Sequence, residues 1–368
     1  MKKYVLILAV LFSFSTSSVH AENQVLYTCG HRCKAPDSKV TLMAVGDIMM
    51  HKTQLDAGYN KETDSYNFGT FFKYIAPTLK EGDIVYGNLE TPVAGRERKY
   101  TGYPNFNAPQ ELLTELKNNY FTHLSIANNH SLDRGAKGIR ATVENIDALG
   151  FTRVGARSDR LESTYKITEK NGLRIGFLSY TYGVNGNRLP KDQDYMLSYI
   201  DKNNIKNDIA VVKKEQVDAV VVYFHFGVEY KTTQNKFQKE IAQLACDSGA
   251  TIVLGAHPHV LEPITTLNRG NCLVAYSLGN FISGMSALYT DLGGILKVTI
   301  TKLGDTITTQ PEFIPTWVQR GRNSAGVRTF TVLPLDMTKI PNDITVTKAE
   351  QKRIRAYQTF VDTKIFRK

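Results

Sequence analysis

Several kinds of segment are missing from this 368-residue chain. The apolar run Tyr4–Phe14 is too short to span a bilayer by itself, which takes about 20 apolar residues. No Gly-x-x-x-x-Gly-Lys-Ser/Thr phosphate loop is present, so ATP-driven ligation would have to come from another protein, and no Gly-x-Ser-x-Gly elbow marks a serine nucleophile. Internal repeats and low-complexity stretches are also absent. The length suits one large domain, or one domain with an appendage.

The N-terminus carries the features of a signal peptide. Lys2 and Lys3 precede the apolar run, and a small polar stretch follows it. This order predicts a peptide over residues 1–21 that is cleaved on export, followed by a leader at residues 22–38. An uncleaved anchor is the alternative, and no cysteine lies close enough to the run for a lipid anchor. We expect a periplasmic or cell-envelope location.

Cysteine is scarce as well, with four residues in the chain. Export would place them where thiols oxidise, and one arrangement joins Cys29 to Cys33 and Cys246 to Cys272. Spacing alone does not settle the pairing. A second interpretation makes Cys29, His31 and Cys33 a metal clip, but these side chains fall short of a zinc site without further ligands.

Basic residues outnumber acidic residues in the chain. The formal net charge is +10, and about +8 remains once Lys2 and Lys3 leave with the signal peptide. This balance favours a polyanionic partner, and export makes nucleic acid unsuitable, so an acidic polymer or an anionic envelope surface fits better. The alternative is a charge that serves solubility, because the basic residues are spread out apart from clusters at 96–99 and 352–355.

From Val40 onward, short apolar or β-branched runs alternate with amphipathic stretches, which is typical of an α/β fold with a mostly parallel sheet. The expected strands are Val40–Val45, Ile84–Gly87, Thr122–Ala127, Leu173–Ser179, Ala219–Phe224, Thr251–Gly255 and Cys272–Ser277. The segments Ile295–Ile300 and Thr306–Gln310 predict an antiparallel hairpin and suggest a second, mixed sheet.

Amphipathic segments between the strands predict helices that pack on the sheet. The spacing is carried by Ile139, Val143 and Ile146 in one segment and by Phe237, Ile241, Leu244 and Ala245 in another. A final helix is expected over Lys348–Val361. The chain therefore divides into a main domain at residues 39–320 and a C-terminal extension at residues 321–368.

Polar residues directly follow five of the expected strands. They are Gly46-Asp47, Asn88-Leu89-Glu90, Asn128-Asn129-His130, His225 and His257-Pro258-His259. Loops at the carboxyl ends of parallel strands line one crevice, so these side chains should converge. Carboxylates, an amide and imidazoles suit Zn, Mn or Fe better than Ca or Mg, so we predict one or two divalent transition-metal ions. A single histidine at a strand end is usually structural, but five coincidences weaken that interpretation.

Six segments resemble, in order, the motif series of the CapA/PgsA family of capsule and poly-γ-glutamate biosynthesis proteins. They are Gly46–Met49, Gly87–Thr91, Ala127–Asp133, His225–Tyr230, Gly255–Val260 and Tyr276–Phe281. The similarity runs from about Thr41 to Phe281. This family is related to the calcineurin-like metallophosphoesterases, so the resemblance implies a metallophosphoesterase-like α/β/β/α double-sheet sandwich with metals at one rim.

The resemblance implies a role for each matching residue. Those that match metal ligands are Asp47, Glu90, Asn129, His225, His257 and His259, and His130 matches a general acid. Met49 stands where the superfamily has the histidine of an Asp-x-His motif, so the half served by Asp47 and His259 loses a ligand. The half served by Glu90, Asn129, His225 and His257 keeps a full set. His51 is a candidate replacement ligand, with a supporting role or no role as the alternatives.

Weaker candidates for contacts to substrate or to the ligands are Asn88, Asn128, Glu229, Tyr230, Asn280, Arg96 and Arg98. The loop of Arg96 and Arg98 could overhang the crevice and meet a polyanion, or simply be solvated. Glu229 and Tyr230 could hold a ligand histidine or cap the next helix. Asn280 is a candidate hydrogen-bond donor to substrate.

Two local features bear on the shape of the crevice. We expect Pro258 to hold His257 and His259 extended, with their rings on opposite sides. The turn-rich segments 103–107 and 182–186 could line a substrate cleft.

Three functions remain in competition. The first is an exported metal-binding protein for synthesis, export or processing of poly-γ-glutamate or a related capsule polymer, working with membrane-bound capsule synthesis subunits. It would be a metal-dependent hydrolase or transferase, although the sequence does not choose between amide and phosphoester chemistry. The second is a non-catalytic polymer-tethering subunit, which Met49 and the basic charge favour. The third is a periplasmic metal-dependent phosphoesterase, which rests on analogy of fold.

Overall fold

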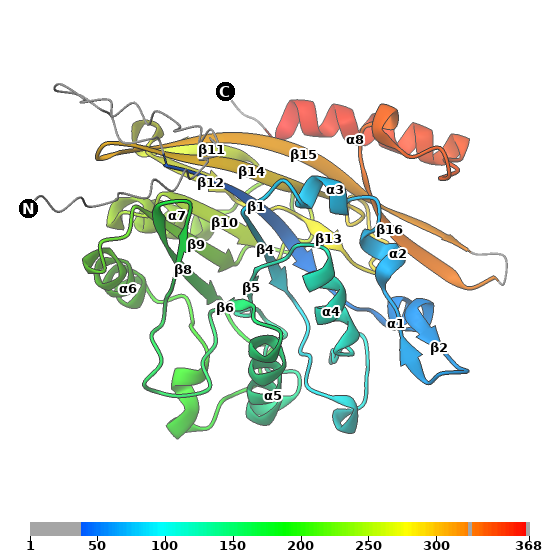
Figure 1. Cartoon of the computed structure of the whole chain (residues 1–368), viewed down its shortest axis with the longest axis horizontal. Coiled ribbons are helices and arrows are strands. Elements are labelled where there is room, and N and C mark those ends of the chain that lie inside the picture. Colours follow the sequence, from blue (N-terminus) through cyan, green and yellow to red (C-terminus); the bar gives the residue numbers. More distant parts are fainter. Residues whose placement is uncertain (1–37, 323–325, 366–368) are drawn as a thin grey trace, which may run out of the picture. The chain divides into compact units, whose positions relative to one another are not determined.

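The computed structural model describes residues 38–322 and 326–365. The predicted signal peptide, nearly all of the leader and the Cys29–Cys33 pair lie outside the described residues. Within the two described ranges, no helix is long and apolar enough to cross a membrane. This part of the chain forms two large mixed β-sheets with helices on their outer faces (Figure 1).

The first sheet has the strand order β16-β15-β14-β1-β4-β5-β6. Its parallel strands are β1 (Ser38–Ile48), β4 (Ile84–Leu89), β5 (His123–Ser125) and β6 (Thr152–Val154), and β13 (Asn280–Ile282) pairs in parallel with the end of β1. Its antiparallel strands are β14 (Leu292–Leu303), β15 (Thr306–Arg322) and β16 (Arg328–Pro334). The expected hairpin is present, but it extends this first sheet, because β14 pairs with the edge of β1 that β4 leaves free.

The second sheet has the order β11-β12-β10-β9-β8-β7. Its parallel centre consists of β8 (Leu173–Thr181), β9 (Ala219–His225), β10 (Ile252–Ala256) and β12 (Cys272–Ala275), and the edges β7 (Lys166–Lys170) and β11 (Ile264–Leu267) are antiparallel. A small hairpin of β2 (Tyr59–Asn60) and β3 (Ser65–Tyr66) is separate from both sheets. The seven strands expected from Val40 to Ser277 are present within three residues of their expected ends, whereas β15 continues well beyond the expected Thr306–Gln310.

Helices cover the outer face of each sheet. The first sheet carries α1 (Lys52–Gly58), α2 (Gly69–Phe72), α3 (Ala76–Leu79), α4 (Glu111–Asn118) and α5 (Gly135–Ala148), and the second carries α6 (Lys202–Lys214) and α7 (Lys236–Ser248). Side chains along β1 alternate between the two faces of its sheet. Val40, Leu42 and Ala44 face the second sheet, whereas Met43 and Val45 face the helices. This arrangement confirms the expected α/β/β/α double-sheet sandwich.

Helix α7 corrects one detail of the expected packing. Ile241 is buried as expected, but Phe237 is 41% exposed. Gln238 points inward instead, because it completes the N-terminal capping box with Asn235 and donates through its amide to the buried Glu262.

A disulfide between Cys246 of α7 and Cys272 of β12 ties this helix to the second sheet. It confirms one of the two expected pairs and fits an oxidising compartment. Closing a chain segment of this length stabilises the fold by about 3 to 4 kcal/mol in the chain-entropy account.

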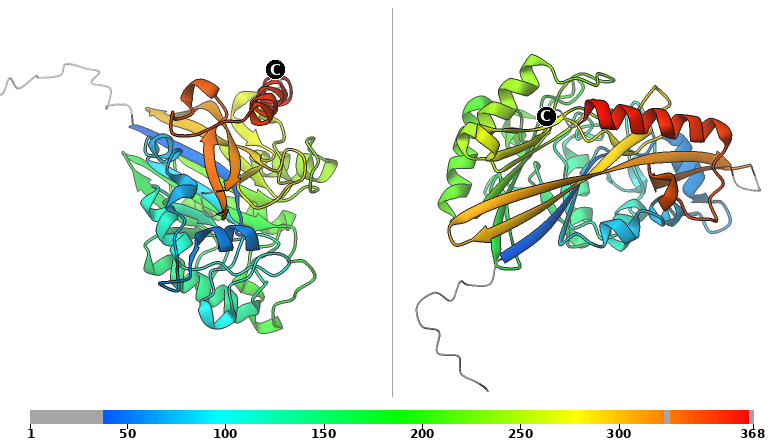
Figure 2. Two further views of the ribbon diagram at one scale, coloured as in Figure 1. Left: turned by 90° about the vertical axis from the view of Figure 1, so that its right-hand side faces the viewer. Right: turned by 90° about the horizontal axis from the view of Figure 1, so that it is seen from above.

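The C-terminal segment packs on the same core as the preceding strands. β15 continues through residue 320 to Arg322, and β16 pairs with it. Helix α8 (Lys348–Lys364) lies along β14 and β15 (Figure 2), and it buries Ile354 and Tyr357 in the core that the two sheets share. Asp291 fixes this position by accepting from the hydroxyl of Tyr357 and pairing with Arg353. The expected final helix is therefore present and three residues longer than expected.

Candidate metal centre

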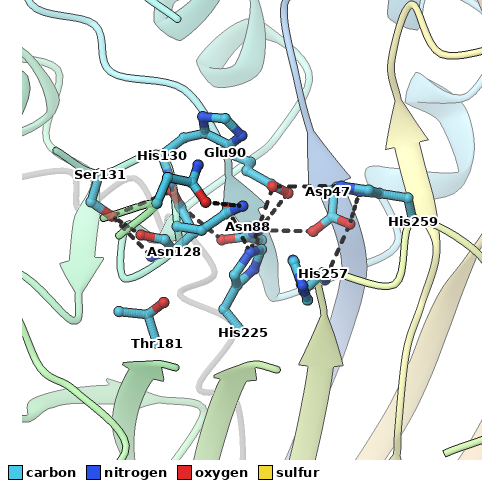
Figure 3. Close-up of polar contacts among 12 residues, drawn as sticks. Asp47, Asn88, Glu90, Asn128, His130, Ser131, Thr181, His225, His257 and His259 are labelled. Atoms are coloured by element: carbon cyan, nitrogen blue, oxygen red, sulfur yellow. Dashed lines mark hydrogen bonds and ion pairs between the residues drawn. The ribbon is translucent and has the colours of Figure 1, made fainter. Parts of the chain in front are cut away.

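The carboxyl ends of parallel strands from both sheets meet at one rim. Asp47 lies at the end of β1, Glu90 directly after β4, His225 at the end of β9 and His257 directly after β10. Figure 3 shows these side chains turned toward one another from the two sheets. The strand-end prediction that these residues converge is therefore confirmed by their positions.

A glycine allows β1 to reach this rim. A Cβ added to Gly46 would lie 1.8 Å from the carbonyl oxygen of Gly279, so no larger residue fits without displacing the backbone. The close approach lets the Asp47 N–H donate to that carbonyl at 2.9 Å. The backbone around Asp47 is thereby held at a fixed position.

The two carboxylates are fully buried and lie next to each other. Asn88 Nδ2 donates to Asp47 Oδ1 at 2.8 Å and lies 3.4 Å from Glu90 Oε2. Burial raises the pKa of Glu90 well above its usual value, and the charge of Asp47 raises it further. Burial also opposes ionisation of Asp47, but hydrogen bonding and charge from His259 lower its pKa overall. A bound cation would allow both carboxylates to ionise.

Three imidazoles face these carboxylates. Glu90 Oε1 lies 3.5 Å from His225 Nε2 and 3.8 Å from His259 Nε2, and His259 Nδ1 lies 3.0 Å from Asp47 Oδ2. Burial lowers the pKa of His225, and burial with the charge of His259 lowers that of His257 to about 3. The imidazoles of His225 and His257 are therefore neutral near pH 7, which is the form that binds metal ions.

Two buried atoms show that these residues fit a metal ion. Glu90 Oε1 and His257 Nδ1 are buried and have no hydrogen-bond partner, a costly condition in a protein without a ligand. Ligand atoms within 4.8 Å of one another form two groups, one of Glu90, His257 and His259 and one of Asp47, Glu90 and His225. Glu90 belongs to both groups. Mixed carboxylate and imidazole ligands suit a divalent transition metal.

The two groups differ from the halves that the resemblance implies. His257 groups with His259, whereas the resemblance places it with His225. Met49, which stands where the resemblance implies a histidine, is buried. His51 lies outside both groups, and its Nδ1 accepts from the Gly284 N–H at 3.2 Å. Burial and the charge of His259 lower the pKa of His51 to about 4.

The backbone around Pro258 does not follow the expected extended path. His257 and His259 both have positive φ, +98° and +59°, and their ring centroids lie 5.9 Å apart. The prediction of extended histidines on opposite sides was wrong, because the chain turns after β10 and the His257 N–H donates to Asp47 Oδ2 at 3.3 Å. Each such conformation of a non-glycine residue costs about 1 to 3 kcal/mol.

His130 lies beside the ligand cluster and is held by Asp133. Its Nδ1 is 2.8 Å from Asp133 Oδ2, which also accepts from the Phe106 N–H at 2.7 Å. The Phe106 ring packs edge-on against the His130 ring at 4.6 Å. With Nδ1–H donated to Asp133, Nε2 is the nitrogen available for proton transfer. We assigned no role to Asp133 from the sequence, although its position three residues after His130 was a usable signal.

Three asparagines connect the ligands. Asn129 Oδ1 lies 2.9 Å from His225 Nε2, and Asn88 Nδ2 lies 3.2 Å from His225 Nδ1. Asn128 Nδ2 donates to Asn88 Oδ1 at 3.2 Å and to the Leu89 carbonyl at 2.8 Å. Asn129 thus has its oxygen in a ligand position, whereas Asn88 and Asn128 form the scaffold that orients the ligands.

Asn280 also contacts a ligand. Its Oδ1 lies 3.1 Å from His259 Nδ1, and its amide donates to the carbonyl of Thr290 at 2.9 Å. Its side chain is buried and orients His259, so the amide is not free to donate to substrate as we expected.

The remaining candidates lie at the periphery. The Tyr230 N–H donates to the Pro258 carbonyl at 2.8 Å, and Glu229 is exposed. Arg96 pairs with Asp64 at 2.7 Å, and Arg98 donates to a backbone carbonyl and pairs with Glu97. In the described chain, neither arginine joins the hydrogen-bond network of the centre.

Tyr182 is a neighbour of the centre that the strand-end rule would have found. It follows β8, and its ring centroid lies 4.6 Å from that of His257 and 6.2 Å from that of His225. Asn185, in the same turn-rich segment, accepts from Asn129 Nδ2 at 3.3 Å. The sequence named the segment 182–186 as a possible lining of a cleft, but gave neither residue a contact with the candidate ligands.

Comparison with known sequences finds relatives that span this rim. Residues 41–285 match the family described as bacterial capsule synthesis protein PGA_cap. The chain is similar to the capsule biosynthesis protein CapA of Bacillus anthracis, with 31% identity over 296 residues that cover 77% of this chain and 69% of the relative. It is also similar to the PGA biosynthesis protein CapA of Bacillus subtilis (strain 168), with 31% identity over 281 residues that cover 73% and 70%.

Two solved structures resemble this fold. The calcineurin-like phosphoesterase YfkN of Bacillus subtilis has a TM-score of 0.47 at 14% identity, covering 89% of this chain and 99% of that one. The NAD nucleotidase NadN of Haemophilus influenzae has a TM-score of 0.49 at 12% identity, covering 90% of this chain and 57% of that one. Both similarities concern the fold and not the reaction.

Proposed function

Because the chain belongs to the family of bacterial capsule synthesis proteins, we propose that it is an exported, metal-dependent hydrolase or transferase for a capsule polymer. The polymer is poly-γ-glutamate or a related acidic chain, which the name of the Bacillus subtilis relative supports. The enzyme acts in synthesis, export or processing of this chain, alongside membrane-bound capsule synthesis subunits.

The observation that carries an enzymatic role is the His130–Asp133 pair next to the buried ligand cluster. A divalent ion held by Asp47, Glu90 and the three histidines would supply a Lewis acid for a carbonyl or phosphoryl oxygen. His130 then donates a proton from Nε2 to the leaving group, and Asp133 keeps the ring oriented for that transfer. A subunit that only tethers polymer needs no such oriented acid.

The first experiment measures the metal content of the mature protein. Wild type should retain about one or two Mn, Zn or Fe ions, and His225→Ala with His257→Ala should lose them. His123→Gln is the matched control, because this buried histidine bonds Thr168 at 2.8 Å and lies outside both ligand groups. Metal content that survives the double replacement contradicts the site.

The second experiment tests turnover. Metal-loaded wild type should shorten or transfer poly-γ-glutamate, and His130→Ala should lose this activity while keeping its metal. If a phosphodiester reporter is the only substrate turned over, the phosphoesterase alternative replaces the proposal. If neither substrate reacts above the His130→Ala background, the tethering subunit is the better description, in line with the buried Met49 at the position of a ligand.

A further inference from the structure

A cleft outside the metal centre lies between the start of α1 and the segment that follows Arg98. Its volume is about 420 Å³, and it is lined by Lys52, Arg134 and residues 100–105. The lining includes two cations, two tyrosines and no acidic side chain. Tyr103 is 72% exposed, which is unusual for an aromatic side chain that packs only for stability.

The cleft is separated from the candidate general acid by one layer of side chains. The buried Phe106 ring lies 4.6 Å from the His130 ring, 5.1 Å from the His51 ring and 6.3 Å from the Tyr103 ring. Arg134 directly follows Asp133, the residue that holds His130. A polymer lying in the cleft would therefore pass one layer of side chains away from His130.

The wall of the cleft is held in place by its own hydrogen bonds. Arg134 donates to the hydroxyl of Thr101 and to the Asn105 carbonyl. The backbones of Thr101 and Asn107 exchange hydrogen bonds of 2.9 and 3.1 Å. Arg134 Nε is buried and has no partner. This part of the surface is therefore formed before any ligand binds, which lowers the entropic cost of binding.

The charge of the cleft suits an anion. Lys52 pairs with Asp56 at the surface, and their side chains are 69% and 57% exposed. Exposed pairs of this kind contribute about 0 to 1 kcal/mol, so an incoming carboxylate can replace Asp56. The acidic neighbour of Arg134 in sequence, Asp133, is already bonded to His130. Lys52 is therefore available to a ligand, whereas Arg134 adds its positive charge from the wall that it holds in place.

We propose that the cleft lined by Lys52, Tyr103 and Arg134 holds a stretch of the acidic polymer next to the bond that reacts. A free carboxylate of the polymer pairs with Lys52 in the positive field of Arg134, and the methylene groups of the polymer lie on Tyr103. The proposal rests on the proposed function, because it takes the polymer as the substrate. In this proposal the metal centre carries out the reaction, and the cleft holds the polymer.

The test uses the metal-loaded mature protein and a defined poly-γ-glutamate oligomer, with binding measured by calorimetry at low and high salt. Lys52→Gln with Tyr103→Ala should weaken binding about tenfold and reduce its salt dependence, while metal content stays unchanged. The matched control is Lys73→Gln, because Lys73 is also an exposed lysine paired with a surface acid, Asp343, and lies outside the cleft. This control should bind like wild type.

The outcomes separate this proposal from the proposed function. If wild type binds and the double variant binds equally well, the cleft is wrong and the proposed polymer stands. If wild type does not bind the oligomer, both are wrong. Equal weakening by Lys73→Gln would assign binding to general basic charge and overturn the cleft. Thermal unfolding of each variant checks that the fold is intact, and Arg134→Lys, which keeps the charge and loses the forked hydrogen bonds, provides a second variant with an expected intermediate affinity.

Discussion

Two clusters of buried charge in this protein are built in opposite ways. In the first, the nearly buried guanidinium of Arg153 donates to Asp147 at 2.8 and 3.1 Å, to Glu162 at 2.8 Å and to the Ala156 carbonyl at 2.7 Å. In the second, at the metal centre, Glu90 Oε1 is buried without a hydrogen-bond partner. A buried network with all of its partners stabilises a fold, whereas one that lacks partners must be retained for another reason.

The pKa values of the acidic groups in the two clusters shift in opposite directions, although burial alone would raise both. Burial opposes ionisation of Glu162, but hydrogen bonds from Ser158 and Arg153 outweigh it and lower the pKa of Glu162 to about 2. Burial raises the pKa of Glu90, and the charge of the neighbouring Asp47 raises it further. The difference teaches that the first cluster is neutralised by a side chain of the protein, whereas the second is a group of residues that could hold a cation from solution.

The largest effect is expected from Glu90→Gln, because Glu90 belongs to both ligand groups. Metal affinity should fall by more than about 100-fold, the upper end of what supporting residues alone contribute. In the presence of a chelator, the variant should be at least as stable as wild type, since a buried charge without a cation has been removed. Metal titration and urea unfolding measure the two quantities. If the variant is less stable than wild type in the presence of a chelator, the Glu90 carboxylate stabilises the fold without a metal, and the contrast with the Arg153 cluster is wrong.

Arg153→Met should give the opposite pattern. Its free energy of unfolding should fall by about 2 kcal/mol, because Asp147 and Glu162 lose their shared cation, and their partial exposure limits the loss. Metal affinity should remain that of wild type. Both quantities come from the same titrations. Loss of metal binding in this variant would show that the two clusters are coupled.

Glu262 lies between these extremes, since Gln238 donates to one of its oxygens and the other has no partner. Burial raises its pKa to about 8. A raised folded pKa contributes stability that is complete below the unfolded value near 4.5 and is lost as pH rises through about 8. Glu262→Gln should therefore remove the fall in stability between pH 5 and pH 8 that titration of Glu262 causes. Chemical unfolding across this range tests it, and parallel curves for variant and wild type would contradict it.

The smallest effect is expected from Glu162→Gln, which tests the acid side of the comparison. A lowered folded pKa contributes stability above the unfolded value near 4.5 that is lost as pH falls through about 2. The variant should be slightly less stable than wild type at pH 7, and the two should converge below pH 3. Thermal unfolding at a series of acidic pH values measures the difference. A constant difference down to pH 2 would mean that the carboxylate charge is not the cause.

Much of the fold was predictable because it depends on local pattern. Alternating buried residues in β1, such as Leu42 and Ala44 on one face and Met43 on the other, identify a strand covered on both sides. Weakly patterned edges such as β7, and the short β6, were not expected. The partner of β14 was not predictable either, because a hairpin carries no information about which free sheet edge it will join.

The family was also predictable, since the match over residues 41–285 confirms the resemblance drawn from the motifs. The positions of Asp47, Glu90 and His225 followed from one rule about strand ends. The orientation of His257 and His259 did not, because a turn with positive φ depends on the Asp47 carboxylate that receives the His257 N–H from another sheet. The role of Asn280 was not predictable either. Its hydrogen bond to His259 forms only in the folded protein, so the sequence suggested a contact with substrate instead.

The positive φ angles of His257 and His259 lower the stability of the fold, so stability alone does not explain these two residues. Glycine adopts this backbone without the steric penalty that a side chain brings, so a chain selected only for its fold would gain by having glycine at both positions. This chain has histidine at both positions and forgoes the stability that glycine would provide. Efforts to engineer a more stable version of this protein should therefore leave these two positions unchanged, because the substitutions that relax the loop also remove two candidate metal ligands.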